Sequence, residues 1–354
     1  MQSMVFALLV AFLAVLAMGP FVIEKLRRLN FGATERNYGL ETHNKKTGTP
    51  IMGGIMILAA LAVAALVFSP AQTRWSLMLP AVLFALGFGG IGFLDDFIKA
   101  VRKRPEGLSA KQKIALQVLL SLAAALFCYF SPYVGSKIYV PFTDIQWDLG
   151  IWYIPFAVFT IVATTNSVNL MDGVDGLLST VTMIVMVALG LVALFAQSAG
   201  VDAQAAGAMS VLCAATAGAC LGFLRFNAYP ARVFMGDTGS LALGGFVASA
   251  AFILKMPIFI VIVGFIYLWE SISVMLQVGW FKLTKRKYGE GRRFLLPQRS
   301  FRSFLRWAKR NTAHRYSLLP RLSCGDLPPR IFGASACRKT PAMWIPAFWP
   351  IPLL

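Results

Sequence analysis

The chain is poor in charged residues, and in acids above all. Of its 354 residues 14% are charged and 58% are hydrophobic, with 15 Asp and Glu against 33 Lys and Arg. A soluble domain carries about 25% charged residues, because its surface must be hydrated. The shortage of charge excludes an ordinary soluble domain, and the apolar content excludes a disordered chain. The composition predicts a membrane protein with several spans.

Cysteine and histidine are also scarce. The five Cys form no CxxC pair, and the chain has two His. This argues against a disulfide framework and against a zinc site. Cys128, Cys213 and Cys220 lie inside apolar segments, where a thiol behaves as a small hydrophobic group.

Long apolar runs, in contrast, are abundant. A helix needs about 20 mostly apolar residues to cross a bilayer. Nine segments meet this requirement: 4–23, 50–69, 76–94, 114–132, 151–169, 177–197, 205–224, 238–254 and 257–280. The first is predicted to be an uncleaved span, because its basic residues follow it. We therefore expect an all-α polytopic membrane protein with nine recognisable transmembrane helices.

The basic residues alternate between the connections. Segments 24–49 and 95–113 hold six each, whereas 70–75 and 133–150 hold one each. Lys and Arg collect in the loops that stay inside the cell. The pattern predicts a periplasmic N-terminus. It explains the net charge of +7 carried by residues 1–290 without nucleic acid as a partner, whereas the rest of the total of +18 lies in residues 291–354.

Five aspartates fall at the predicted cytoplasmic ends of spans, and one glutamate, Glu270, lies well inside a span. The aspartates are Asp95, Asp96, Asp172, Asp175 and Asp237. Ionisable groups near the membrane are costly and are candidates for function. The alternative is that each aspartate merely caps a helix. For Glu270, a structural role among helices is an alternative to catalysis.

Three motifs carry the five aspartates: GFGGIGFLDDFIKA from residue 87, NSVNLMDGVDGL from 166 and RFNAYPARVFMGDTGSL from 225. A fourth motif, HNKKTGTPIMGG from residue 43, carries two lysines ahead of a Thr-Pro-Ile turn, well placed for phosphate. Adjacent carboxylates suit Mg²⁺ binding or proton removal. Asp95 and Lys99 share a helix face, with Asp96 directed elsewhere. The glycines between 87 and 92 permit close helix packing. Asp237 either caps the helix that follows it or binds a cation.

Together these motifs resemble the polyprenyl-phosphate N-acetylhexosamine-1-phosphate transferase superfamily. LWESISVMLQVGWFKLTKRKYGEG, from residue 268, narrows the resemblance to the phospho-N-acetylmuramoyl-pentapeptide transferases. The resemblance implies transfer of phospho-MurNAc-pentapeptide from UDP-MurNAc-pentapeptide to undecaprenyl phosphate, giving lipid I and UMP. It also implies ten spans, a Mg²⁺ cofactor, the bacterial inner membrane, an active site on its cytoplasmic face, and a second copy of the chain as a candidate partner.

The resemblance also implies residue roles. Asp237 would be the principal Mg²⁺ ligand, and Asp95 and Asp96 would act on the lipid phosphate or help to hold the metal. The nucleotide would contact a further set: Lys46, Asp172, Gly173, Val174, Asp175, Asn227 and Phe234. Phe234 would stack on the uracil.

The resemblance ends near residue 293, which divides a membrane transferase domain, 1–293, from an atypical basic tail, 294–354. From residue 291 onward the chain holds 12 basic residues and one acid, and it lacks the HHHFE motif and tenth span of the family. Three origins stay open: a frameshifted translation, an authentic divergent end, or a basic membrane-surface segment. We expect the chain as written to have impaired activity.

Two other functions compete with this one. A sister enzyme that uses UDP-GlcNAc shares the DD and nucleotide motifs. A transporter or lipid flippase also has many spans with polar groups inside them. Transport sites lie near the bilayer midplane, often within inverted repeats, whereas these acids gather at one face and no repeat is visible.

Overall fold

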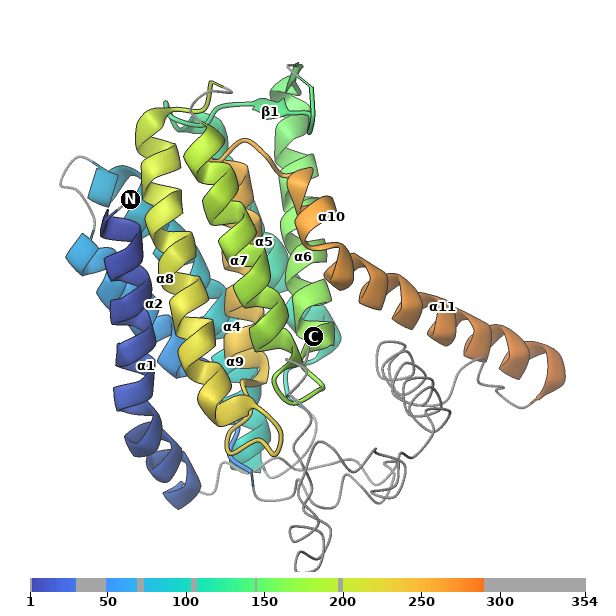
Figure 1. Cartoon of the computed structure of the whole chain (residues 1–354). Coiled ribbons are helices and arrows are strands. Elements are labelled where there is room, and N and C mark those ends of the chain that lie inside the picture. Colours follow the sequence, from blue (N-terminus) through green and yellow to red (C-terminus); the bar gives the residue numbers. More distant parts are fainter. Residues whose placement is uncertain are drawn as a thin grey trace, which may run out of the picture. The chain divides into compact units, whose positions relative to one another are not determined.

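The computed structural model describes residues 2–29, 49–68, 73–102, 107–143, 145–196 and 200–289. Most of them are helical (Figure 1). The long helices are α1 (Gln2–Arg28), α2 (Gly54–Phe68), α4 (Leu79–Arg102), α5 (Ala110–Phe130), α6 (Tyr153–Met171), α7 (Leu177–Ala196), α8 (Ala203–Asn227), α9 (Gly236–Ile253) and α11 (Phe265–Tyr288). Shorter elements are a π-helix (Arg74–Met78), a 3-10 helix (Gly150–Trp152) and α10 (Phe259–Val263).

The predicted all-α membrane fold is confirmed. Within the described residues, seven helices are long and apolar enough to cross a membrane. Two of the nine predicted segments take another form. Segment 50–69 yields the 15-residue α2, because residues 50–53 form a loop. Segment 257–280 is interrupted at Gly264, which separates α10 from α11.

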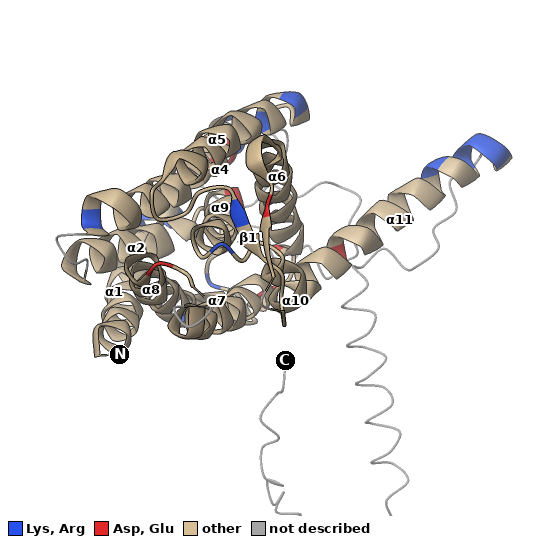
Figure 2. Ribbon diagram, turned by 90° about the horizontal axis from the view of Figure 1, so that it is seen from above, with Lys and Arg blue, Asp and Glu red and all other residues tan. Residues whose placement is uncertain are grey.

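Helix α9 lies in the centre of the bundle, surrounded by α2, α4, α6, α7 and α8 (Figure 2). All its residues from Thr238 to Ile253 are buried. Glycines permit this close packing. A Cβ at Gly92 of α4 would lie 2.6 Å from the Thr238 backbone N. Gly90, by contrast, has nothing within 4 Å of such a Cβ, so the glycine run is only partly a packing surface.

The connection from α5 to α6 contains a β-hairpin that helical periodicity does not predict. Strands β1 (Lys137–Tyr139) and β2 (Gln146–Asp148) are antiparallel, with Ile138 opposite Trp147. The Asp148 carboxylate accepts hydrogen bonds from Ser136 Oγ at 2.7 Å and from the Gly150 N–H at 3.0 Å. These bonds lower the pKa of the Asp148 carboxyl.

The contact pattern divides the chain into residues 1–272 and 273–354. The first unit contains the whole bundle from α1 to α10 and the first turns of α11. Of the second unit, the structure describes 273–289, which continue α11. The tail 294–354 lies outside the described residues.

Candidate active site

Chain topology brings the acidic motifs to one end of the bundle. Successive long helices run in opposite directions, so the last turns of α4 and α6 meet the first turns of α5 and α9. Three of the five predicted aspartates form a tight group there. Carboxylate oxygens of Asp95, Asp96 and Asp237 all lie within 4.8 Å of one another. Asp95 and Asp96 are each 3% exposed.

Two lysines bind this carboxylate group. Lys99 Nζ lies 2.5 Å from Asp95 Oδ2 and 2.8 Å from Asp237 Oδ2. Lys113 Nζ lies 2.8 Å from the same Asp237 oxygen and 3.6 Å from Asp95 Oδ2. The predicted helix-face pairing of Asp95 with Lys99 is confirmed. Counted as ionised groups, three carboxylates and two ammonium groups give this centre a formal charge of −1.

Asp96 faces α9. Its Oδ2 accepts hydrogen bonds from the Thr238 backbone N at 2.9 Å and from Thr238 Oγ1 at 2.8 Å. The first N–H groups of a helix have no partner within the helix, and Asp96 satisfies one of them. The predicted alternative, in which Asp237 caps its own helix, is wrong: the N-cap residue is Met235, whose own side chain makes no capping hydrogen bond. Asp237 is thus left to interact with other helices.

Asn169 also holds Asp237. Its Nδ2 donates to Asp237 Oδ1 at 2.8 Å and to Ser240 Oγ at 2.8 Å. Sequence reasoning selected neither Asn169 nor Lys113 as a site residue. Asn169 lies three residues before Asp172 within the NSVNLMDGVDGL motif, and this helical spacing could have indicated it. Lys113 is one of six basic residues in its segment, and nothing in the sequence distinguishes it.

The predicted nucleotide residues form a second cluster beside the first. Asn227 is 3% exposed, and its Oδ1 accepts from the Gly176 N–H at 3.1 Å and from Ser179 Oγ at 3.2 Å. Its Nδ2 donates to the Val233 carbonyl at 3.0 Å. Asp175 accepts from the Ala231 N–H at 3.3 Å. These bonds hold the 172–176 turn against the 228–235 loop.

Asp172, Gly173, Val174 and Asp175 in the turn and Phe234 in the loop are all partly buried. Both the oxygen and the nitrogen of the Asn227 side-chain amide are hydrogen-bonded within the protein. Glu270 is buried in α11 at 2% exposure and is not one of the three grouped carboxylates.

The HNKKTGTPIMGG motif, residues 43–54, joins the site through its main chain. The Phe234 N–H donates to the Pro50 carbonyl at 2.8 Å, and the Gly53 N–H donates to the Phe234 carbonyl at 2.9 Å. A third bond runs from the Gly54 N–H to the Met235 carbonyl at 3.0 Å. The start of α2 is thereby fixed beside the start of α9. Lys46, in the same motif, lies outside the described residues.

The carboxylate group fits a hard divalent cation. Oxygen ligands at close spacing suit Mg²⁺, and Asp95, Asp96 and Asp237 supply such oxygens from two helices. The formal charge of the three carboxylates also exceeds that of the two lysines. The arrangement can therefore hold a cation beside two flexible ammonium groups, a combination suited to binding phosphate.

Comparisons with known proteins agree with the geometry. Residues 78–255 match the family model described as Glycosyl transferase family 4. The chain is 48% identical over 289 residues to the phospho-N-acetylmuramoyl-pentapeptide-transferase of Clostridioides difficile (strain 630), covering 81% of this chain and 86% of that relative. It is 44% identical over 289 residues to the enzyme of the same name from Clostridium novyi (strain NT), covering 81% and 85%.

Proposed function

This chain belongs to the phospho-N-acetylmuramoyl-pentapeptide-transferase family, and we propose that it transfers phospho-MurNAc-pentapeptide from UDP-MurNAc-pentapeptide to undecaprenyl phosphate. The products are lipid I and UMP, in peptidoglycan synthesis. The observation that carries the proposal is the group formed by the buried Asp95 and Asp96 and the partly buried Asp237 at one end of the apolar bundle. The geometry suits a reaction between a lipid in the membrane and a nucleotide in the cytoplasm.

We propose Mg²⁺ as the cofactor, with Asp237 as the principal ligand and Asp95 and Asp96 beside it. Bound Mg²⁺ would neutralise the diphosphate and stabilise the leaving UMP. Lys99 and Lys113, both within 2.8 Å of Asp237, can turn toward phosphate oxygens. The catalytic contribution of the protein is then mainly to position two substrates and to compensate their charge.

The nucleotide is proposed to bind at the junction of the 172–176 turn and the 228–235 loop. Phe234 is only partly buried and offers a stacking face to the uracil. Asp172, Gly173, Val174 and Asp175 supply backbone and carboxylate groups. We assign Asn227 to the same pocket as the residue that fixes its two walls, and we retain Lys46 as a phosphate contact.

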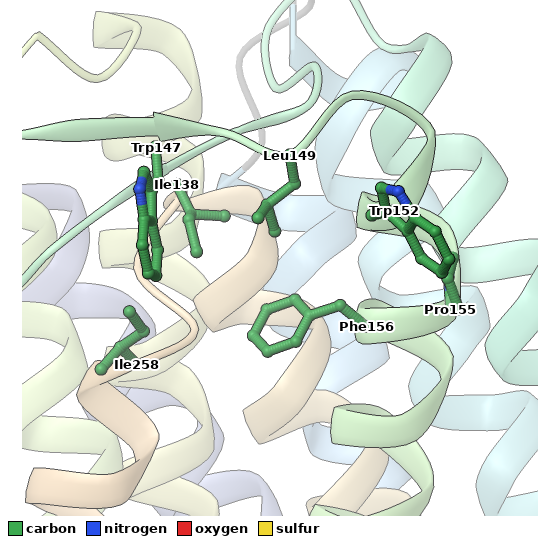
Figure 3. A pocket seen from close by; sticks show the side chains of 7 residues that line it. All are labelled: Ile138, Trp147, Leu149, Trp152, Pro155, Phe156 and Ile258. Atoms are coloured by element: carbon green, nitrogen blue, oxygen red, sulfur yellow. The ribbon is translucent and has the colours of Figure 1, made fainter.

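The lipid chain is proposed to occupy an apolar groove between α6 and α10. A cavity of about 350 Å³ there is lined mainly by apolar side chains, from Phe156 down to Ser167 on α6. A second, wholly apolar pocket lies beneath the hairpin, with Trp147 and Trp152 on its two sides (Figure 3). The two cavities share Phe156 and Ile258. Tryptophans favour the membrane–water boundary, which supports a lipid-facing groove.

We place the protein in the bacterial inner membrane with the carboxylate group on the cytoplasmic side. The alternation of basic segments supports this orientation. We assign catalysis to residues 1–293. We also propose that the protein assembles as a homodimer. The atypical tail, 294–354, is proposed to make this chain slower than its relatives.

The test uses the full chain in lipid nanodiscs with undecaprenyl phosphate and Mg²⁺. UMP release and the mass of the lipid product are measured with UDP-MurNAc-pentapeptide and with UDP-GlcNAc. We expect transfer from the first donor only. A preference for UDP-GlcNAc would identify the sister activity, and no UMP from either donor would overturn the proposal. A chimera of residues 1–293 with the C-terminal segment of the C. difficile relative is expected to be faster than the natural chain.

A further inference from the structure

A buried side-chain pair joins α5 to α6 next to the carboxylate group. Gln117 is 0% exposed, and its Oε1 accepts a hydrogen bond of 2.6 Å from Asn166 Nδ2. The same Nδ2 donates to the Val162 carbonyl at 2.8 Å, one turn earlier in α6. Burial of an amide in an apolar span is costly unless the amide is hydrogen-bonded. The bond therefore constrains the distance between the two helices.

Each partner of this pair lies about one helical turn from a residue that binds Asp237. Lys113 precedes Gln117 by four residues, and Asn169 follows Asn166 by three, so each pair shares a helix face. Lys113 binds Asp237 Oδ2 and Asn169 binds Asp237 Oδ1, both at 2.8 Å. The contacts close a ring from Asp237 through α5, the Gln117–Asn166 bond and α6 back to Asp237.

We propose that Gln117 is a positioning residue for Asp237. Its hydrogen bond to Asn166 holds α5 and α6 in a register in which Lys113 and Asn169 bind opposite oxygens of the Asp237 carboxylate. Without this bond the two helices separate, and the carboxylate loses its fixed orientation toward a cation. The catalytic meaning of this role rests on the proposed function, but the orientation of Asp237 can be measured separately.

The test compares Gln117→Met, which keeps the length of the side chain but removes the acceptor, with Gln117→Glu, which keeps an acceptor oxygen. Ser121→Ala is the matched control. Ser121 lies one turn further along the same face of α5, is 0% exposed, and its Oγ has no hydrogen-bond partner among the described residues. Binding of Mn²⁺ to the full-length protein, followed by electron paramagnetic resonance, is the main readout.

We expect Gln117→Met to weaken Mn²⁺ binding about 10- to 100-fold, the range for residues that orient a metal ligand. In the transfer assay, kcat should fall while KM for the nucleotide stays near its wild-type value. Gln117→Glu should recover most of the Mn²⁺ affinity, and Ser121→Ala should leave it unchanged. The thermal unfolding midpoint identifies a variant that does not fold; Asn166→Leu, which breaks the same bond, then replaces Gln117→Met.

A double variant separates positioning from general destabilisation. If Gln117 acts through Asn169, then Gln117→Met should cause little further loss in an Asn169→Ala background. Multiplied losses, or equal effects of Gln117→Met and Ser121→Ala, would overturn the proposal, as would a wild-type protein that binds no Mn²⁺. Wild-type protein that binds Mn²⁺ but releases no UMP would contradict the proposed function alone, since the binding comparison still decides the role of Gln117.

Discussion

At the scale of single residues, the carboxylate of Asp237 is the point where three other helices meet. Lys99 from α4 and Lys113 from α5 bind one of its oxygens, and Asn169 from α6 binds the other. Asp96 plays a different part, because Thr238 occupies its Oδ2 through two hydrogen bonds. Asp237 and Asp96 thus have different structural roles. Asp237 binds side chains from three other helices, and Asp96 binds the start of α9.

Asp237→Asn tests the role of the Asp237 carboxylate in catalysis. Loss of one charged ligand should lower kcat about 10²- to 10³-fold, as for other groups that stabilise charge in a transition state. UMP release at saturating Mg²⁺ measures the effect. Asp148→Asn, in the exposed hairpin, is the control and should keep wild-type activity. A less than threefold effect (roughly 0.6 kcal/mol) of Asp237→Asn would remove Asp237 from catalysis.

Asn227→Ala tests the junction of the 172–176 turn and the 228–235 loop. The change leaves two buried donors and one carbonyl without their partner, and should lower the free energy of unfolding by about 1–3 kcal/mol. Ser179→Ala removes only one of the three bonds and should cost less. Thermal unfolding in detergent, together with KM for the UDP-sugar, measures both variants. Unchanged stability with a raised KM would instead indicate that Asn227 mainly contacts substrate.

At the scale of elements, glycines set how closely α4 approaches α9. The first turn of α9 presents Asp237 and Thr238 directly against Gly92 of α4, and Asp95 and Asp96 follow within one turn. Close contact of these two helices is what brings acids 141 and 142 positions apart in the sequence into one group. The close spacing of the three carboxylates therefore depends on Gly92, which has no side chain.

Gly92→Ala and Gly90→Ala make a matched pair on one helix. A Cβ at Gly92 would collide with the main chain of Asp237 and Thr238, so the variant should lose about 1–3 kcal/mol of stability and most of its activity. Gly90→Ala meets open space and should be neutral, or stabilising by up to about 1 kcal/mol. Unfolding midpoints and UMP release are measured for both. Equal behaviour of the two variants would contradict the packing role of Gly92.

At the scale of the whole molecule, the two ends of the bundle differ in chemistry. One end carries the carboxylates, the lysines, the 172–176 turn and the 228–235 loop. The other carries the hairpin, with Phe142 at 88% exposure and Trp147 at 60%. The division matches the alternation of basic segments along the chain, and it predicts which loops face each side of the membrane.

Cysteine labelling in whole cells tests this orientation. The described native cysteines, Cys128, Cys213 and Cys220, are buried, and Cys324 and Cys337 are first replaced by Ser. A membrane-impermeant maleimide should then label Phe142→Cys in intact cells. Tyr229→Cys, in the 84%-exposed position of the 228–235 loop, should react only after the cells are opened. The reverse pattern would invert the proposed topology.

The sequence by itself determined the membrane class, the all-α fold, most helix positions and the family, because apolar length and local motifs are properties of contiguous residues. It also placed Asp95, Asp96 and Asp237 at ends of spans that alternation brings to one side. Only the tertiary structure decided which atoms meet: that Asp96 caps α9, that Lys113 and Asn169 bind Asp237, and that Gln117 bonds to Asn166 across two helices. These contacts depend on the rotation and spacing of helices distant in sequence, which the packing of glycines and buried amides sets and which no local pattern encodes.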